Sequence, residues 1–68
     1  MGTIFSYDDV KGFGFIKLDD GRHLFFHVTD CYCHREQIQV GSEVVFAIKE
    51  YRRKNNRLMQ KAINVQVV

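Results

Sequence analysis

The sequence has no tryptophan and no proline, and it has only two cysteines among its 68 residues. It also lacks any apolar stretch near the roughly 20 residues that span a membrane, and it opens with no signal peptide. We therefore expect a soluble, cytoplasmic protein without a membrane partner. The 46% share of apolar residues argues against a disordered chain. The length suits a single domain over residues 1–68, and a domain of this size buries only about 60% of its unfolded surface.

Neither sign of charge dominates, because ten Lys and Arg residues stand against eight Asp and Glu, for a net charge of +2. The basic residues are nevertheless clustered, since five of the ten lie between Lys49 and Arg57, with only Glu50 against them. The acidic residues form the pairs Asp8–Asp9 and Asp19–Asp20. We interpret both pairs as turn residues rather than a metal-dependent nuclease site, because Asp is favoured in turns for its local hydrogen bonds.

Short runs of Phe, Val, Ile and Tyr predict an all-β fold, and no window carries a helical stripe. The expected strands cover residues 2–7, 12–18, 23–28, 43–50 and 58–67, with Asp20-Gly21 as a tight turn. Residues 29–42 hold few strand signals and predict a long connection. Five short strands leave unpaired edges unless they close. We therefore expect a closed five-stranded antiparallel barrel without a long helix.

Alternation along each strand assigns the two faces of this barrel. The expected interior is mainly aliphatic and consists of Gly14, Ile16, Leu18, Leu24, Phe26, Val28, Val44, Phe46, Ile48, Ile63, Val65 and Val67. Three aromatic rings then point outward from neighbouring strands, namely Phe13, Phe15 and Phe25. Burying them instead would turn Ile16 and Leu24 outward, so one face must expose apolar groups either way.

Outward phenylalanines are unfavourable unless something covers them. A nucleic-acid base can do so, because bases stack on aromatic rings at about 1–3 kcal/mol each. Lys11, Lys17 and His27 flank the rings and supply charge for phosphates. Gly12 and Gly14 are expected to leave the ring faces open. The pattern predicts a surface for single-stranded nucleic acid.

Two motifs carry a family resemblance. Residues 11–16, Lys-Gly-Phe-Gly-Phe-Ile, resemble the first ribonucleoprotein motif, and residues 24–28, Leu-Phe-Phe-His-Val, resemble the second. RNA-recognition-motif domains carry these motifs in the opposite order with helices between them. The order found here, the length and the five strands resemble the cold-shock domain, an OB-fold barrel, over about residues 2–67. The resemblance implies nucleic-acid contacts at Phe13, Phe15, Phe25 and His27, with Lys11 on the backbone.

The chain departs from that family at several places. Ser6 and Tyr7 stand where cold-shock proteins usually carry Trp-Phe, so one stacking position is lost, and Tyr7 stays a candidate contact. Phe5 replaces a usual Lys, and it could compensate or pack against a partner. The long connection lacks the usual Gly and Phe, and Tyr32 or Arg35 could replace the missing ring. The last departure is an unusually basic loop, which adds the candidate phosphate contacts Arg52, Arg53, Lys54 and Arg57.

Other chemistry is less well supported. Cys31 and Cys33 are one residue apart, which disfavours an unstrained disulfide, so we expect free thiols. Structural zinc usually needs four ligands at wider spacing, and a nucleophile and base as close in sequence as Cys33 and His34 rarely face each other. We expect no metal, no cofactor and no enzymatic reaction. The sequence leaves two functions open: binding single-stranded RNA or DNA as an RNA chaperone, or serving as a protein-interaction or localisation module on the same barrel. It leaves the oligomeric state open.

Overall fold

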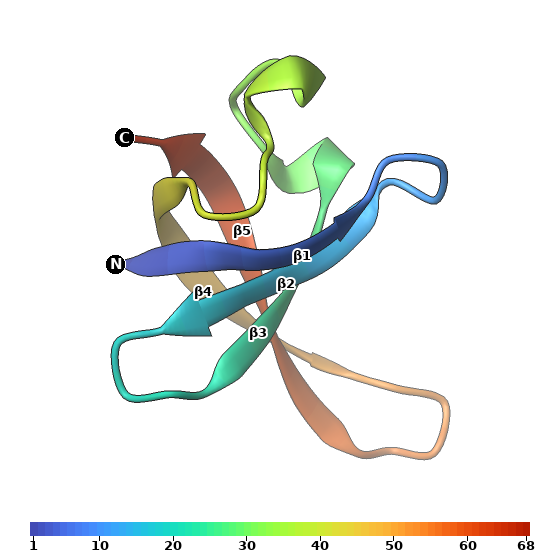
Figure 1. Cartoon of the computed structure of the whole chain (residues 1–68). Helices are drawn as coiled ribbons and strands as arrows, with labels where there is room; N and C mark the ends of the chain where they lie inside the picture. The colour runs from blue at the N-terminus through green and yellow to red at the C-terminus, as the bar shows by residue number, and fades with distance from the viewer.

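The computed structural model describes residues 1–68 and contains five strands and two short 3₁₀ helices (Figure 1). None of the helical segments is long and apolar enough to cross a membrane. Each strand begins and ends within two residues of the bounds expected from the sequence. In chain order the elements are β1 (Gly2–Asp8), β2 (Phe13–Leu18), β3 (His23–His27), η1 (Val28–Asp30), η2 (Arg35–Gln37), β4 (Glu43–Arg52) and β5 (Leu58–Val67).

The strands close into a barrel in the order β1-β2-β3-β5-β4, which confirms the predicted five-stranded OB-like fold. Four of the neighbouring pairs are antiparallel, but β3 and β5 run parallel, with Phe25 opposite Lys61 and Phe26 opposite Ala62. The predicted antiparallel barrel thus contains one parallel pair. The reason is topological: five strands in a ring cannot all alternate in direction, so one neighbouring pair must be parallel.

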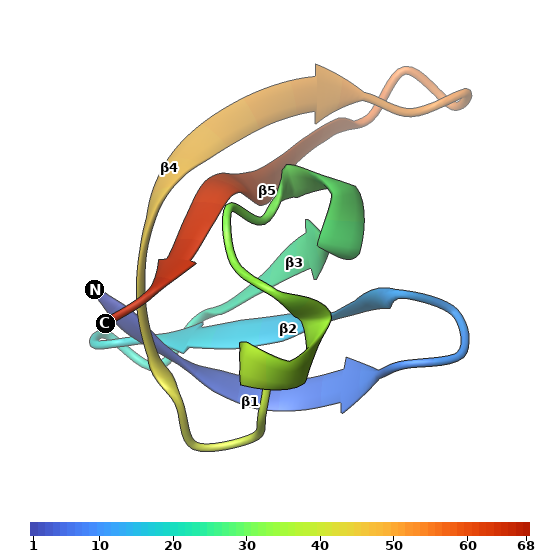
Figure 2. The same cartoon turned by 90° about the horizontal axis from the view of Figure 1, so that it is seen from above.

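The barrel interior is built from the aliphatic positions that alternation predicts. Ile16, Phe26 and Val44 are fully buried, and the half-buried Phe46 packs against them. The connection between β3 and β4 crosses one end of the barrel (Figure 2). It adds the buried Ile38 to the core, which alternation along the strands did not predict. The complete buried cluster is Ile4, Ile16, Leu24, Phe26, Ile38, Val44, Ala62 and Val65.

Two interior assignments, at Ile48 and Ile63, were wrong. Ile48 is 47% exposed although it lies opposite the fully buried Ala62, because its side chain borders an open hollow with Leu18 and Phe46 at the end of the barrel. Ile63 lies opposite the exposed Ala47, while its neighbour Ala62 is fully buried. The cause is an irregular register between Val45 and Ala47, matched on β5 by a left-handed φ of 54° at Asn64. Alternation therefore changes phase on β5, where the inward positions run from Val65 to Ala62, whereas β4 keeps its period of two.

β1 contains a similar irregularity that reverses one predicted orientation. Its register with β2 shifts between Ile4 and Ser6, so that Ser6 lies opposite Phe15 on the outer face and Tyr7 lies opposite the buried Gly14. Phe5 is the extra residue of this bulge. Simple alternation from Ile4 would have sent Tyr7 outward, and the bulge turns it inward instead.

Gly14 has a structural role that differs from the one expected. A Cβ atom on Gly14 would point into the barrel, colliding with the Ser6 carbonyl oxygen and lying 3.0 Å from Cε1 of Phe26. Its lack of a side chain thus allows β1 to approach β2, and it does not serve to open the faces of the outward rings. Gly12 has a φ of 76°, a left-handed conformation that suits the turn before β2.

The acidic pairs lie at turns, as expected. Oδ1 of Asp8 accepts hydrogen bonds from the backbone N–H groups of Val10 (3.0 Å) and Lys11 (3.1 Å). Asp20 accepts the backbone N–H of Arg22 at 3.1 Å and also pairs with its guanidinium at 2.7 Å. The backbone hydrogen bond is the largest of the influences that lower the pKa of Asp20. Both carboxylates therefore fix the turns that join β1 to β2 and β2 to β3.

Candidate nucleic-acid interface

A cluster of aromatic rings covers the outer face of β2 and β3. Phe13 lies opposite His27 and Phe15 lies opposite Phe25, so the two strands present these side chains in adjacent rows. The ring centroids of Phe13 and Phe25 are 5.6 Å apart, and those of Phe15 and Phe25 are 6.0 Å apart in an edge-on arrangement. Phe15 remains 39% exposed and the other two are half-buried. We call Phe13, Phe15 and Phe25 the aromatic platform.

The platform has a gap and an extension on its β1 side. Ser6 lies opposite Phe15, and its small side chain leaves this position of the outer face without an aromatic ring. Next to it, the 53% exposed ring of Phe5 stacks on His23, with centroids 4.5 Å apart and an interplanar angle of 22°. His23 lies opposite Lys17 on β2, so this second aromatic pair continues the outer face toward the β2–β3 turn. Phe5 therefore adds exposed aromatic surface, although not at the position of the missing ring.

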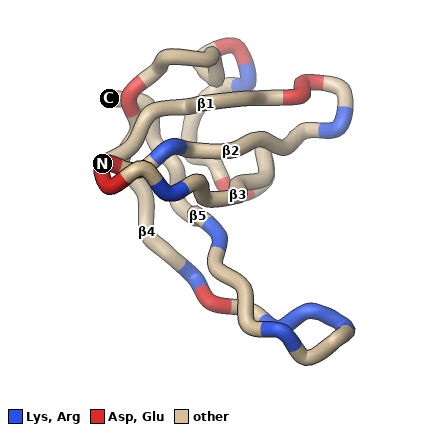
Figure 3. Tube along the Cα trace, turned by 60° about the horizontal axis from the view of Figure 1, so that its bottom comes forward, with Lys and Arg blue, Asp and Glu red and all other residues tan.

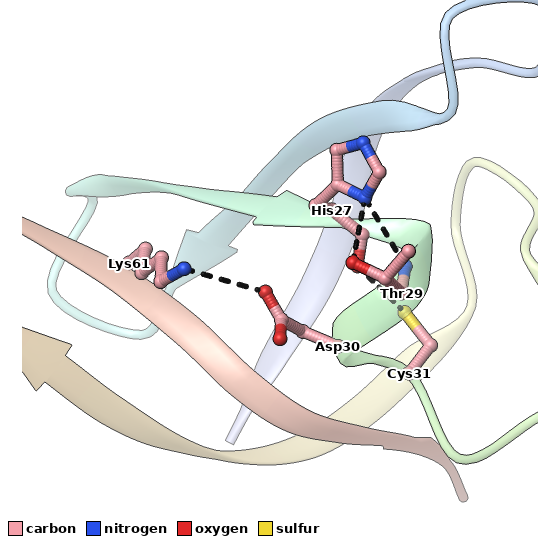
Figure 4. A network of polar contacts seen from close by, with 5 residues as sticks. All are labelled: His27, Thr29, Asp30, Cys31 and Lys61. Carbon is pink, nitrogen blue, oxygen red and sulfur yellow. Dashed lines mark hydrogen bonds and ion pairs between the residues drawn. The ribbon is translucent and has the colours of Figure 1, made fainter.

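His27 is held at the edge of the platform by the turn that follows it (Figure 4). Its Nδ1 atom lies 2.9 Å from Oγ1 of Thr29 and accepts the backbone N–H of Thr29 at 3.2 Å. Because Nδ1 accepts a proton donor, the neutral ring carries its own proton on Nε2. The hydrogen bonds also fix the ring beside Phe13, and Nε2 is left to donate to another group.

Basic side chains surround the platform. Lys11 is exposed in the turn before β2, and Lys17 is exposed on β2 itself. The hairpin of β4 and β5 runs away from the barrel and carries further basic residues at its tip (Figure 3). We call residues 49–61, which form this extension, the arm. Its exposed cations at and near the tip are Arg52, Arg53, Lys54 and Arg57.

The structure separates the predicted basic residues of the arm into two sets. Arg53 lines a groove together with Phe15 and Phe25 of the platform. Arg52, in contrast, lies opposite Leu58, and its guanidinium donates to the backbone oxygen of Asn56 at 3.3 Å. Arg53 is therefore directed toward the platform, whereas Arg52 closes the tip of the hairpin.

Tyr7 is the predicted contact that the structure places elsewhere. Its ring lies on the inner side of β1 and stacks on Phe26 at 6.0 Å between centroids, and its hydroxyl is buried without a hydrogen-bond partner. The cause is the bulge at Phe5, which turns the end of β1 inward. The ring has no access to the outer face, so Tyr7 does not belong to the platform.

Neither candidate for the missing ring lies beside Ser6. The backbone N–H of Tyr32 donates to the carbonyl oxygen of Val65, which ties that residue to β5. Arg35 lies close to Gly12 and lines a hollow next to Tyr7 at the end of the barrel. The gap at Ser6 is thus not filled from the long connection.

Sequence reasoning missed three residues near the platform. Tyr51 and Met59 lie opposite each other on the arm, and both line the groove with Phe15 and Phe25. Lys61 lies opposite Phe25 in the parallel pair. A period of two does place these three residues on one face of the arm, but the sequence does not reveal that this face turns toward β2 and β3.

The two cysteines are free thiols, as expected, and both pack at the margin of the core. Burial, together with the neighbouring Cys33, raises the pKa of the Cys31 thiol to about 12. A thiol that stays protonated at neutral pH is a poor nucleophile and a poor metal ligand. No group of three or more His, Cys, Asp or Glu side chains is arranged to hold a metal ion.

Comparison with known proteins agrees with this geometry. A search of curated proteins found no significant match. A comparison with protein families found the 'Cold-shock' DNA-binding domain, which matches residues 1–68. The match covers the whole sequence, including the platform strands and the arm. The chain therefore belongs to the cold-shock DNA-binding domain family, a family of nucleic-acid-binding proteins rather than of enzymes.

Proposed function

We propose that this protein binds single-stranded RNA or DNA by stacking unpaired bases on the aromatic platform. The observation that carries the proposal is that Phe13, Phe15 and Phe25 contact one another on the outside of a barrel whose interior is already filled. Because these side chains point outward, they contribute little to the stability of the core. Exposed apolar rings that lie together in this way indicate a binding surface. Bases suit such rings because every base has a flat face, whatever the sequence.

The polar groups around the platform fit the rest of a nucleotide. Lys11 and Lys17 are exposed near the platform rings, and we expect them to contact phosphates beside a stacked base. Arg53 borders the rings of Phe15 and Phe25 from the arm. Nε2 of His27 is free to donate to a base edge or a phosphate. Binding of this kind needs no cofactor and no chemical reaction, and we infer a cytoplasmic location in keeping with free thiols.

An RNA-chaperone activity follows from this preference for single strands. A ring can stack only on a base whose face is free, so the protein should bind unfolded RNA and not the paired form. Ligands that bind one state alone shift the equilibrium toward it by mass action. The protein should therefore lower the melting temperature of a weak RNA hairpin as its concentration rises.

The test is a titration with oligothymidine, oligouridine and a duplex, followed by amide chemical shifts. We expect both single strands to shift the amides of the platform and of His27, and the duplex to do so only weakly. Tyr7 and the buried Phe26 should respond little. If neither oligonucleotide binds, the platform must serve another partner, and the barrel would then be better described as a protein-interaction or localisation module.

A further inference from the structure

The arm turns one of its faces toward the platform. Residues opposite each other on β4 and β5 share a face, and here the pairs are Lys49 with Lys61 and Tyr51 with Met59. Since Lys61 also lies opposite Phe25 across the parallel pair, this face of the arm continues the outer face of β3. The β4–β5 hairpin bends away from β3 as it leaves the barrel (Figures 2 and 3), and at this bend the side chains of Tyr51 and Met59 border those of Phe15 and Phe25.

A groove of about 400 Å³ lies at this bend, between Phe15 and Phe25 on one side and Tyr51, Arg53 and Met59 on the other. Its volume falls in the range of about 300–1,000 Å³ that is usual for sites of small organic ligands. Four of the five lining side chains are aromatic or apolar, and the fifth is a cation. This composition fits a flat, weakly polar group that carries an anion.

Tyr51 is held in place from the side of the barrel. The Lys61 ammonium lies 5.6 Å from the centre of the Tyr51 ring, close enough for a cation–π contact. Lys61 is itself positioned by Asp30, whose carboxylate lies 3.6 Å from its Nζ atom (Figure 4). Both ends of this ion pair are largely screened from solvent, at 28% side-chain exposure each. The outer wall of the groove is therefore preformed, which lowers the entropic cost of binding.

We infer that this groove is a further nucleotide subsite at the edge of the platform, in which one unpaired base enters between Phe15 and Phe25 on one side and Tyr51 on the other. Met59 forms the end of the slot, and Arg53 contacts the phosphate of the same nucleotide. The inference rests on the proposed function and extends it, because it predicts that the protein binds one nucleotide more than the platform alone can hold. A simple phosphate would leave the four apolar walls unused, whereas a nucleotide uses the walls and the cation together.

The experiment measures affinity against oligothymidine length, from about 4 to about 12 nucleotides, within the range of OB-fold site sizes. Wild type is compared with Tyr51→Ala, Tyr51→Phe, Met59→Ala and, as control, Leu58→Ala. Leu58 is the neighbour of Met59, is 52% exposed and lies on the opposite face of the arm. Thermal melts establish that each variant is folded.

We expect the affinity of wild type to rise with length until the platform and the groove are filled. Tyr51→Ala and Met59→Ala should reach their plateau about one nucleotide earlier and bind the longest strand at least about fivefold more weakly. The shortest strand should bind them as it binds wild type. Tyr51→Phe should keep the stacking face and behave as wild type, and Leu58→Ala should have no effect.

Three results would overturn the inference. If Tyr51→Ala matches wild type at every length while Phe15→Ala binds weakly, the groove is unused although the proposed function holds. If Leu58→Ala weakens binding as much as Met59→Ala, the arm acts through its general stability and not through this groove. If wild type binds no oligonucleotide of any length, both the inference and the proposed function fail.

Discussion

Phe25 and Phe26 are adjacent in the chain and lie on opposite faces of β3. Phe26 is fully buried in the barrel, whereas Phe25 lies outside, within 6.0 Å of both Phe13 and Phe15 between ring centroids. The same residue type therefore serves the core at one position and the outer surface at the next. This difference makes the two residues a matched pair for separating stability from binding.

Replacing Phe25 with Ala should weaken binding of a short oligopyrimidine by about 1–3 kcal/mol, because one stacking surface is removed. The same should hold for Phe13→Ala and Phe15→Ala, with little change in thermal stability. Phe26→Ala should instead cost roughly 3–5 kcal/mol of unfolding free energy, and the half-buried Phe46 should also affect mainly stability. Affinity and a thermal melt are measured for all five variants. If Phe15→Ala unfolds the protein and leaves binding unchanged, the assignment of faces is wrong.

Gly14→Ala should reduce stability rather than affinity. The new methyl group would collide with the Ser6 carbonyl oxygen and press on Phe26, so β1 must move away from β2. Overpacking of this kind costs about 1–3 kcal/mol, or a melting temperature lower by about 4–8 °C per kcal/mol. Differential scanning calorimetry gives the stability, and titration well below the melting point gives the affinity. A large drop in affinity at unchanged stability would instead support a role for Gly14 in opening the ring faces.

The sequence was sufficient to predict the faces of β2 and β3, because both strands alternate without interruption. It was insufficient where a strand carries an extra residue. The bulge at Phe5 turns Tyr7 inward, and the irregularity that includes Asn64 replaces Ile63 with Ala62 in the core. Bulges depend on how two strands meet, and a pattern read along one strand cannot locate them. The place of Tyr51 beside the platform depends on closure of the whole barrel, so no local signal could have revealed it.

The cysteines should not be needed for folding or for binding. Both are free thiols at the margin of the core, and neither lies on the platform. We expect Cys31→Ser/Cys33→Ser to retain its barrel and its affinity for oligopyrimidine at neutral pH, with at most a modest drop in melting temperature. Circular dichroism and a binding titration check this, and elemental analysis checks the purified protein for metal. A stoichiometric metal that disappears together with stability in the double variant would contradict it.

Cys31 should make the protein sensitive to alkaline pH. Its pKa is raised to about 12 in the folded state, first of all by burial, while an unfolded Cys titrates near about 8.5. The folded state therefore favours the protonated thiol, and this contribution to stability is complete below about pH 8.5 and is lost progressively as the pH rises toward about 12. Urea midpoints from about pH 7 to about pH 9.5, before Lys and Tyr titrate, should fall more steeply for wild type than for Cys31→Ser. Parallel curves for the two proteins would exclude this role.

The arm should supply cations for the phosphates, and chiefly through Arg53. Replacing Arg52, Arg53 and Lys54 together with Ala should weaken binding by similar factors for all sequences, because phosphates carry no sequence information. The slope of log affinity against log salt should flatten by about 0.7 for each phosphate of a single strand that the variant no longer neutralises. Single variants refine the test: Arg53 borders the groove, whereas Arg52 donates to Asn56 at the hairpin tip. Arg53→Ala should therefore change the slope and Arg52→Ala should leave it nearly as in wild type. An unchanged slope in the triple variant would mean that these cations are solvated and do not contact phosphates. Equal effects of Arg53→Ala and Arg52→Ala would mean that phosphate binding does not depend on which face of the arm carries the cation.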